Sequence, residues 1–106
     1  MLITTTSSVD GRPVQEYLGV INAQSIIGAN LFKDIFAGLR DVFGGRSKTY
    51  EKVLEQAKED ALRELSEKAQ ALGANGIVGV DLDFETIGSG GSMLMVVASG
   101  TAVRYS

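Results

Sequence analysis

The sequence predicts an α+β domain with a mainly antiparallel sheet, two helices and the element order ββααββ. Three observations lead to this: an Asp-Gly pair between two β-rich runs, two consecutive stretches with helical spacing, and two alternating stretches at the end. With 106 residues, 44% of them hydrophobic, the chain has material for one domain over residues 1–106. A domain of this size buries about two-thirds of its unfolded surface.

The first two strands are expected to form a hairpin. Leu2 to Val9 is rich in threonine and β-branched residues, and Val14 to Ala23 is a second apolar run. Asp10-Gly11 between them favours a type I′ turn, which needs positive φ at both central positions. Pro13, the only proline, lacks an N–H donor, so the start of the second strand should lie at an edge or face outward.

Two helices are expected next. Apolar residues recur at spacings of three and four from Asn30 to Phe43, and again from Lys48 to Leu72, with Ser47 as N-cap and Gly73 as stop. The second helix would be about 38 Å long, whereas a compact chain of this length has a radius of gyration of about 13 Å. We therefore expect it to project from the subunit or to lie along a neighbouring one.

Two further strands complete the predicted sheet. Gly76 to Thr86 alternates, with Val78, Val80, Leu82 and Phe84 on one face, and a glycine-rich turn, Gly88 to Gly91, follows. Met93 to Tyr105 is apolar on both faces in its first half, which is typical of a central strand. Its small residues make a shallow face that another backbone could approach, so we expect them, with the first helix, at subunit contacts: Ala98, Gly100 and Ala102.

Composition excludes several classes of function. The chain has no cysteine and no histidine, which excludes disulfides, Cys/His zinc sites, thiolate nucleophiles and imidazole bases. Ten basic and thirteen acidic residues give a net charge of -3, which argues against nucleic acid as a partner. No apolar run approaches the roughly 18 residues of a membrane span, and the N-terminus has no leader pattern, so we expect a cytoplasmic protein without a membrane partner.

A glycine pair before the second helix is a candidate anion site. Gly44 and Gly45 could present main-chain N–H groups beside the helix N-terminus, and Arg46, Ser47 and Arg40 could complete a pocket for a small anion. No strand precedes the glycines and the lysine of a phosphate-binding loop is absent, so a helix–helix turn capped by serine is the competing interpretation.

A row of carboxylates on the third strand is a candidate metal site. Asp81, Asp83 and Glu85 share a face at intervals of about 6.6 Å, and their oxygens suit a hard cation. The competing interpretation is a solvated strand face. Met93 and Met95 also share a face and could offer thioethers to Cu(I), but methionines in an apolar strand are typical core residues.

Three separated motifs carry a family resemblance: GGRSKTYE, then LGANGIVGVDLDFETIG, then GSMLMVVASGTAVRY. In this order they resemble the YbjQ-like family, small bacterial and archaeal proteins of unknown function that are often labelled heavy-metal-binding. The resemblance covers essentially the whole chain. It implies a dodecin-like α+β subunit assembled into a homopentameric ring.

The sequence leaves two classes of function open and identifies no cofactor. The first is a non-enzymatic binding or scaffold ring that holds a small ligand or ion in pockets between subunits, because no activated nucleophile and no base with a pKa near neutrality is present. The alternative is a metal-assisted hydrolase or isomerase that uses Asp81, Asp83 or Glu85.

Overall fold

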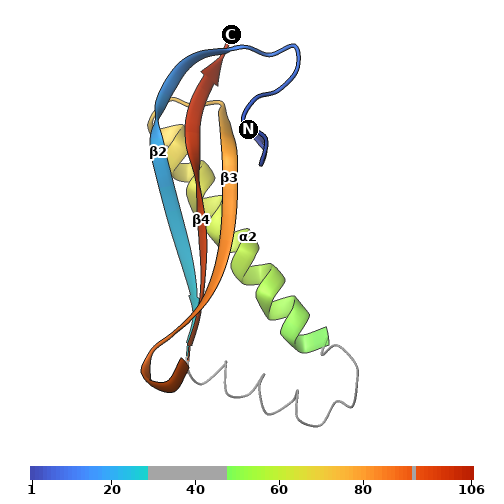
Figure 1. Ribbon diagram of the computed structural model, residues 1–106, viewed down its shortest axis with the longest axis vertical. Coiled ribbons are helices and arrows are strands. Elements are labelled where there is room, and N and C mark those ends of the chain that lie inside the picture. The colour runs from blue at the N-terminus through green and yellow to red at the C-terminus, as the bar shows by residue number, and fades with distance from the viewer. Residues whose placement is uncertain (29–47, 92) are drawn as a thin grey trace.

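A computed structural model describes residues 1–28, 48–91 and 93–106, which form a four-stranded sheet with one helix across one face (Figure 1). The strands lie in the order β1-β3-β4-β2, and the molecule measures 52 × 27 × 17 Å. No helix in these ranges has the length and apolar character needed to cross a bilayer. The elements are β1 (Leu2–Ile3), β2 (Val14–Ile27), α2 (Lys48–Ala71), β3 (Gly76–Ile87), the short 3-10 helix η1 (Ser89–Gly91) and β4 (Met93–Tyr105).

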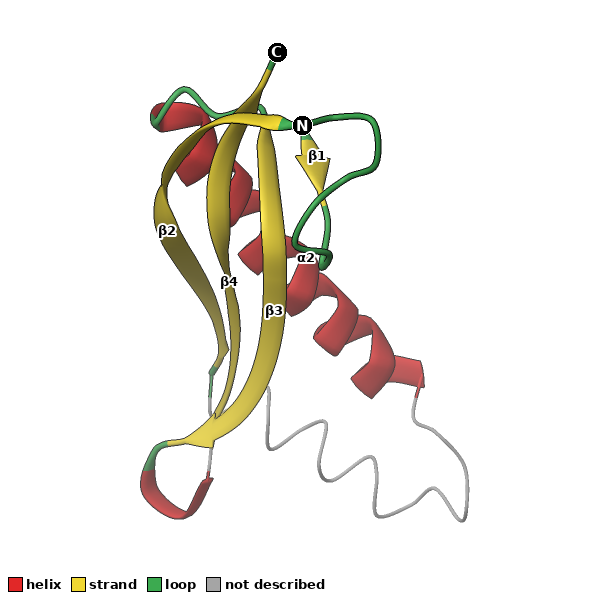
Figure 2. Cartoon of the chain, turned by 45° about the horizontal axis from the view of Figure 1, so that its top comes forward, coloured by secondary structure: helices red, strands yellow, loops and turns green. Residues whose placement is uncertain are grey.

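The predicted antiparallel ββααββ arrangement is wrong. β1 runs parallel to β3, with Leu2 opposite Gly76, while β2 lies at the other edge of the sheet beside β4 (Figure 2). The sheet is therefore mixed, and the described part of the chain contains one α-helix. The helix expected from Asn30 to Phe43 falls outside the described residues.

The Asp-Gly turn forms, but it does not make a hairpin of β1 and β2. The Arg12 N–H donates to the Val9 carbonyl at 3.1 Å, and Gly11 has φ of 76°. No described non-glycine residue, Asp10 included, has positive φ, so the turn is not type I′. A local turn signal does not determine the strand partner, and β2 instead pairs along its length with the apolar strand β4.

Helix α2 ends as predicted, in a Schellman motif. Gly73 has φ of 85°, its N–H bonds the Gln70 carbonyl at 2.9 Å, and the Ala74 N–H bonds the Ala69 carbonyl at 3.0 Å. The centre of the expected apolar stripe is buried, whereas Leu72 lies beyond the last turn and is 47% exposed. The buried members of the stripe are Ala57, Ala61, Leu65 and Ala69, with Val53 and Leu54 packed beside them.

Small residues on both layers bring α2 close to the sheet. The alanines of the helix pack in one cluster with Ala98 and Ala102 of the central strand β4. A Cβ on Gly100 would lie 2.7 Å from Ile77 Cγ2 and 3.3 Å from the Val78 carbonyl oxygen. The small residues of β4 therefore belong to the subunit's own core, and the expectation that they contact a neighbouring subunit is wrong.

A bulge at Gly79 changes the faces of β3. Gly79 has φ of 61°, typical of a bulge whose first residue is glycine, and the pairing shifts from Val78 opposite Thr101 to Asp81 opposite Ser99. Val80 consequently packs in the cluster under α2, whereas Val78 packs on the opposite face. Regular alternation along β3 predicted Val78 and Val80 on one face, and that prediction is wrong.

The N-terminal segment covers only the upper part of the sheet face that is turned away from α2. Leu2, Val9 and Val14 pack against a second cluster that contains Tyr105, whose ring lies 4.7 Å from the Arg12 guanidinium carbon. Below the bulge this face has no cover among the described residues. We call this lower part the open face; it is formed by Met93, Met95, Val97 and Ser99 on β4 and by the residues opposite them on β2 and β3.

Candidate functional site

The carboxylate row lies on the open face, directly after the bulge. Asp81, Asp83 and Glu85 stand opposite Ser99, Val97 and Met95 of β4, and all three carboxylates are exposed. Their common face agrees with the sequence prediction, because β3 alternates regularly from Asp81 onward. Phe84, between two of them, points to the α2 side and is 49% exposed.

Asp81 is the main influence on the pKa of Asp83. A side-chain hydrogen bond with Asp81, and then the negative charge of Asp81, raise the pKa of Asp83 above its ordinary value of 3.8. Partial desolvation and the charge of Glu85 raise this pKa further. The ion pairs found among the described residues lie elsewhere, so the row concentrates negative charge that a bound cation or proton would neutralise.

Sequence reasoning missed the residues that flank this row across β4. Asn22, Gln24 and Ile26 of β2 lie opposite Ser99, Val97 and Met95, so β2 and β3 line the two sides of the open face. Pairing between strands distant in sequence carries no local signal. Alternation in Val20–Ile27 was the available clue.

The two methionines also lie on the open face. Met93 and Met95 are half-buried, and Met95 stands between Ile26 and Glu85. They are therefore not enclosed core residues. Two thioethers beside one carboxylate are a sparse donor set for a soft metal ion.

The donor set does not fit a typical heavy-metal site. Soft and borderline metals are held mainly by cysteine and histidine, and the chain contains neither. Carboxylate oxygens suit hard cations such as Mg²⁺, Mn²⁺ or Ca²⁺. Within the described residues no group of three or more His, Cys, Asp or Glu side chains converges on one point.

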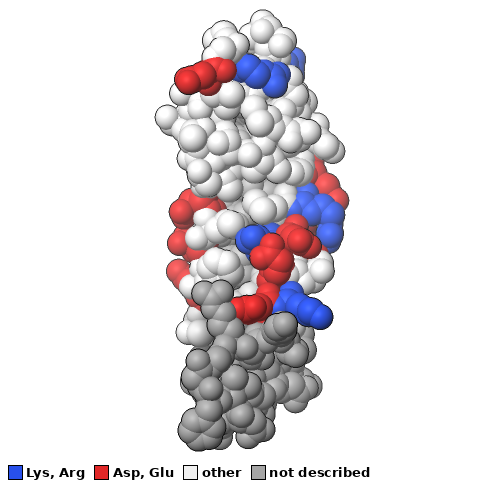
Figure 3. Space-filling view, turned by 90° about the vertical axis from the view of Figure 1, so that its right-hand side faces the viewer, with Lys and Arg blue, Asp and Glu red and all other residues white. Residues whose placement is uncertain are grey.

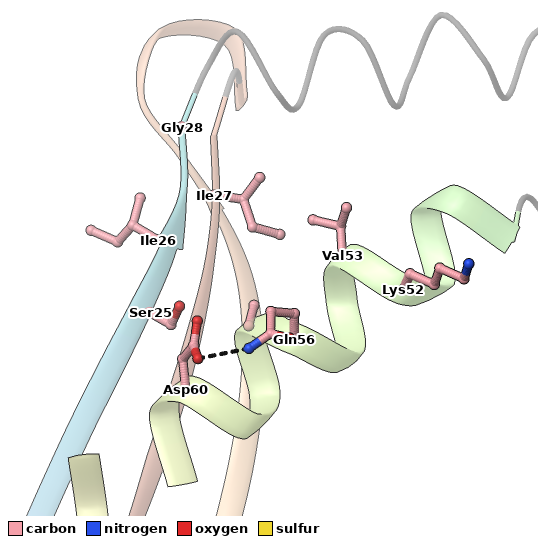
Figure 4. A pocket seen from close by; sticks show the side chains of 9 residues that line it. Ser25, Ile26, Ile27, Gly28, Lys52, Val53, Gln56 and Asp60 are labelled. Carbon is pink, nitrogen blue, oxygen red and sulfur yellow. Dashed lines mark hydrogen bonds between the residues drawn. The ribbon is translucent and has the colours of Figure 1, made fainter. Parts of the chain in front are cut away.

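A separate cavity of about 300 Å³ lies where α2 diverges from the end of β2 (Figure 4). Ile27 and Val53 form part of its apolar wall, and the Gln56 side chain donates a 2.9 Å hydrogen bond to Asp60 at its rim. Gly28, the last described residue before the gap, also lines it. The cavity contains none of the residues that sequence reasoning selected.

The candidate anion site falls outside the described residues. Arg40, Gly44, Gly45, Arg46 and Ser47 all lie in 29–47, and the description resumes at Lys48, where α2 begins. Anion binding at this segment stays a prediction.

Comparison with known proteins gives consistent results. Two relatives named UPF0145 protein, from Caulobacter vibrioides strains NA1000 / CB15N and ATCC 19089 / CIP 103742 / CB 15, are each 59% identical to the chain over 103 residues, covering 97% of it and 98% of their own length. A crystal structure of a protein of unknown function from Pediococcus pentosaceus ATCC 25745, of the DUF74 family, has a similar fold. It has a TM-score of 0.63 at 20% identity, over 100% of this chain and 98% of that one. Residues 1–106 match the YbjQ family described as "Putative heavy-metal-binding", and the chain therefore belongs to that family.

Proposed function

We propose that the chain is a subunit of a non-enzymatic, homo-oligomeric binding or scaffold ring that holds a small ligand or ion between subunits. The family resemblance makes a pentamer the expected size. The observation that carries the proposal is the exposure of large apolar side chains on β2, where Tyr17 is 69%, Val20 83% and Ile26 54% exposed.

The shape of the subunit supports this proposal. Its radius of gyration is 16.7 Å, whereas a compact chain of 106 residues has about 13 Å. A sheet face that remains in contact with water usually carries polar residues. The open face instead carries exposed Ile26 and half-buried Met93 and Met95. A second copy of the subunit would remove such apolar surface from water.

The carboxylate row indicates what kind of ion would be bound. Ca²⁺ takes about six to eight oxygen ligands and Mg²⁺ takes about six. Asp81 and Asp83 supply only part of such a set in one subunit. In this proposal a neighbouring subunit supplies further ligands and water completes the set.

Mass measurement tests the assembly. Sedimentation equilibrium at micromolar concentration should give a multiple of the subunit mass, and native mass spectrometry of protein purified without added ligand should show any co-purifying molecule. A monomer in both measurements would contradict the proposal.

Calorimetric titration tests the ion. Mg²⁺, Mn²⁺ or Ca²⁺ should bind the wild-type protein, and Asp81→Asn and Asp83→Asn should weaken that binding, whereas Glu64→Gln on the exposed surface of α2 should not. Tight binding of Zn²⁺ or Cu²⁺ that survives both aspartate substitutions would show that the chosen ligands are wrong.

The pairing of Asp81 with Asp83 also supports a second candidate, a metal-assisted hydrolase or isomerase. A carboxyl group with a raised pKa, such as that of Asp83, can act as a general acid or base. This candidate requires turnover of a simple test substrate such as p-nitrophenyl phosphate in the presence of Mn²⁺. The turnover should be lost in Asp83→Asn and kept in Glu64→Gln.

A further inference from the structure

Within the described residues the sheet leaves two different strand edges open. β2 has 14 residues and pairs with one described strand, β4. β3 is covered on its outer side only as far as Val80, whose N–H bonds the Thr4 carbonyl at 3.1 Å. Beyond that point Asp81–Ile87 has no outer partner among the described strands. Among the described residues each subunit therefore presents two separate stretches of strand edge without a strand partner, which are templates for another strand.

The two open edges lie at the same level of the sheet. Asn22 of β2 and Asp81 of β3 both stand opposite Ser99, and Ile26 and Glu85 both stand opposite Met95. Because β2 and β3 are each antiparallel to β4, they run in the same direction. Rotation of a second copy about an axis along the strands would bring its β2 edge beside the β3 edge of the first.

Charge selects which edges can meet. The stretch Asp81–Ile87 carries three carboxylates and no basic residue, so two β3 edges would repel each other. Val20–Ile27 of β2 carries no charge, and its exposed Asn22 and Gln24 amides are hydrogen-bond donors suited to carboxylates. Acidic and basic side chains gather at mid-height on the side of the molecule shown in Figure 3, with a smaller group near its top.

The last part of β2, Ala23–Ile27, lacks the features that usually protect an edge strand from pairing, although the first part of β2 has them. Register shifts interrupt its pairing before Gly19, and Lys68 of α2 donates from Nζ to the Asn22 carbonyl at 2.7 Å. Bulges and lysines of this kind normally prevent edge pairing. Ala23–Ile27 has neither, and five residues is close to the common length of a strand.

We infer that the lower part of β2 in one subunit pairs with Asp81–Ile87 of the next, so that one continuous sheet closes the ring. This inference rests on the proposed homo-oligomer and names its contact. Pairing unlike edges is heterologous, and when the rotation between subunits closes, its repetition generates a ring in which every subunit has both edges covered. Pairing of β2 with β2 would instead stop at a dimer and leave the β3 edges open.

Disulfide trapping tests the contact, since the chain has no native cysteine. Gln24→Cys is combined in turn with Asp81→Cys, Asp83→Cys and Glu85→Cys, and each double variant is oxidised and run on a non-reducing gel. At least one combination should give a ladder of covalent multimers that ends at the mass of the ring. A bond within one chain is excluded, because β2 and β3 are separated by two strand spacings, about 9.6 Å, which is beyond disulfide reach.

Control variants distinguish a wrong choice of contact from the absence of an oligomer. Each single variant should give no covalent dimer, and Gln15→Cys with the same β3 cysteines should give none, because Gln15 lies nine residues, about 30 Å, from Gln24 along β2. Dimers from Gln24→Cys alone would show β2–β2 pairing and overturn the inference. Absence of every ladder, while native mass spectrometry still shows the oligomer, would also overturn it but leave the proposed ring standing. A monomeric wild-type protein would remove both.

Discussion

Replacement of Gly100 by alanine should destabilise the fold through crowding alone. Gly100 is buried and its φ is not positive, so the backbone accepts an alanine. The new Cβ, however, would lie 2.7 Å from Ile77 Cγ2, 3.2 Å from Val80 Cγ2 and 3.3 Å from the Val78 carbonyl oxygen. Favourable carbon–carbon contacts are about 3.5–4.0 Å, so the closest neighbour must move by roughly 1 Å.

The expected net cost is about 1–2 kcal/mol. Overpacking of a filled core costs about 1–3 kcal/mol, while Gly→Ala recovers about 0.4–1 kcal/mol by restricting the unfolded chain. Ile77 can relieve part of the crowding by moving its methyl group, but the main-chain oxygen of Val78 is held in the sheet. The larger Gly100→Leu should exceed this cost because it adds three more carbon atoms at the same site.

Urea unfolding at fixed protein concentration measures this effect. The midpoint should fall for Gly100→Ala with an unchanged slope, because the surface exposed on unfolding is the same. Ser99→Ala, one residue away and on the open face, is the matched control and should change the free energy of unfolding by less. Wild-type stability in Gly100→Ala would refute the close contact between β4 and β3 at this position.

Three further outcomes follow from the described contacts. Leu65→Ala should lower the free energy of unfolding by about 2–5 kcal/mol in a urea titration, because Leu65 is 0% exposed. Gly73→Ala should cost about 1 kcal/mol or more in thermal unfolding, since its φ of 85° disfavours a side chain and Arg104 Nη2 lies 2.8 Å from the added Cβ. The raised pKa of Asp83 favours the folded state below its ordinary pKa of 3.8 and loses that contribution as pH rises through the raised value. Asp81→Asn should therefore lower the pKa of Asp83 in an NMR titration and raise the melting temperature near neutral pH; an unchanged pKa would contradict the direct interaction.

The extent of α2, the pairing of β3 with β4 and the central place of β4 were predictable from the sequence. Each depends on local periodicity, as with the buried Ala57-Ala61-Leu65 stripe, or on a run that is apolar on both faces. The partner of β1 was not predictable, because a two-residue parallel pairing with Gly76 and Ile77 depends on chain segments more than 70 residues apart.

The candidate site was likewise predictable in part. The shared face of Asp81, Asp83 and Glu85 follows from regular alternation and was predicted. The position of Gln24 across β4, and the role of Gly79 in turning Val78 away from Val80, depend on register, which is a property of paired strands rather than of either strand alone.

The bulge at Gly79 also anchors the N-terminal segment. In a regular strand successive N–H groups point to opposite sides, yet the Gly79 and Val80 N–H groups both bond the N-terminal segment, at the Thr6 and Thr4 carbonyls. Removal of Gly79 would restore an uninterrupted ladder while Val78 and Asp81 keep their partners Thr101 and Ser99. The one extra residue thus creates a docking point for the N-terminal segment, while the residues before and after the bulge keep their partners on β4.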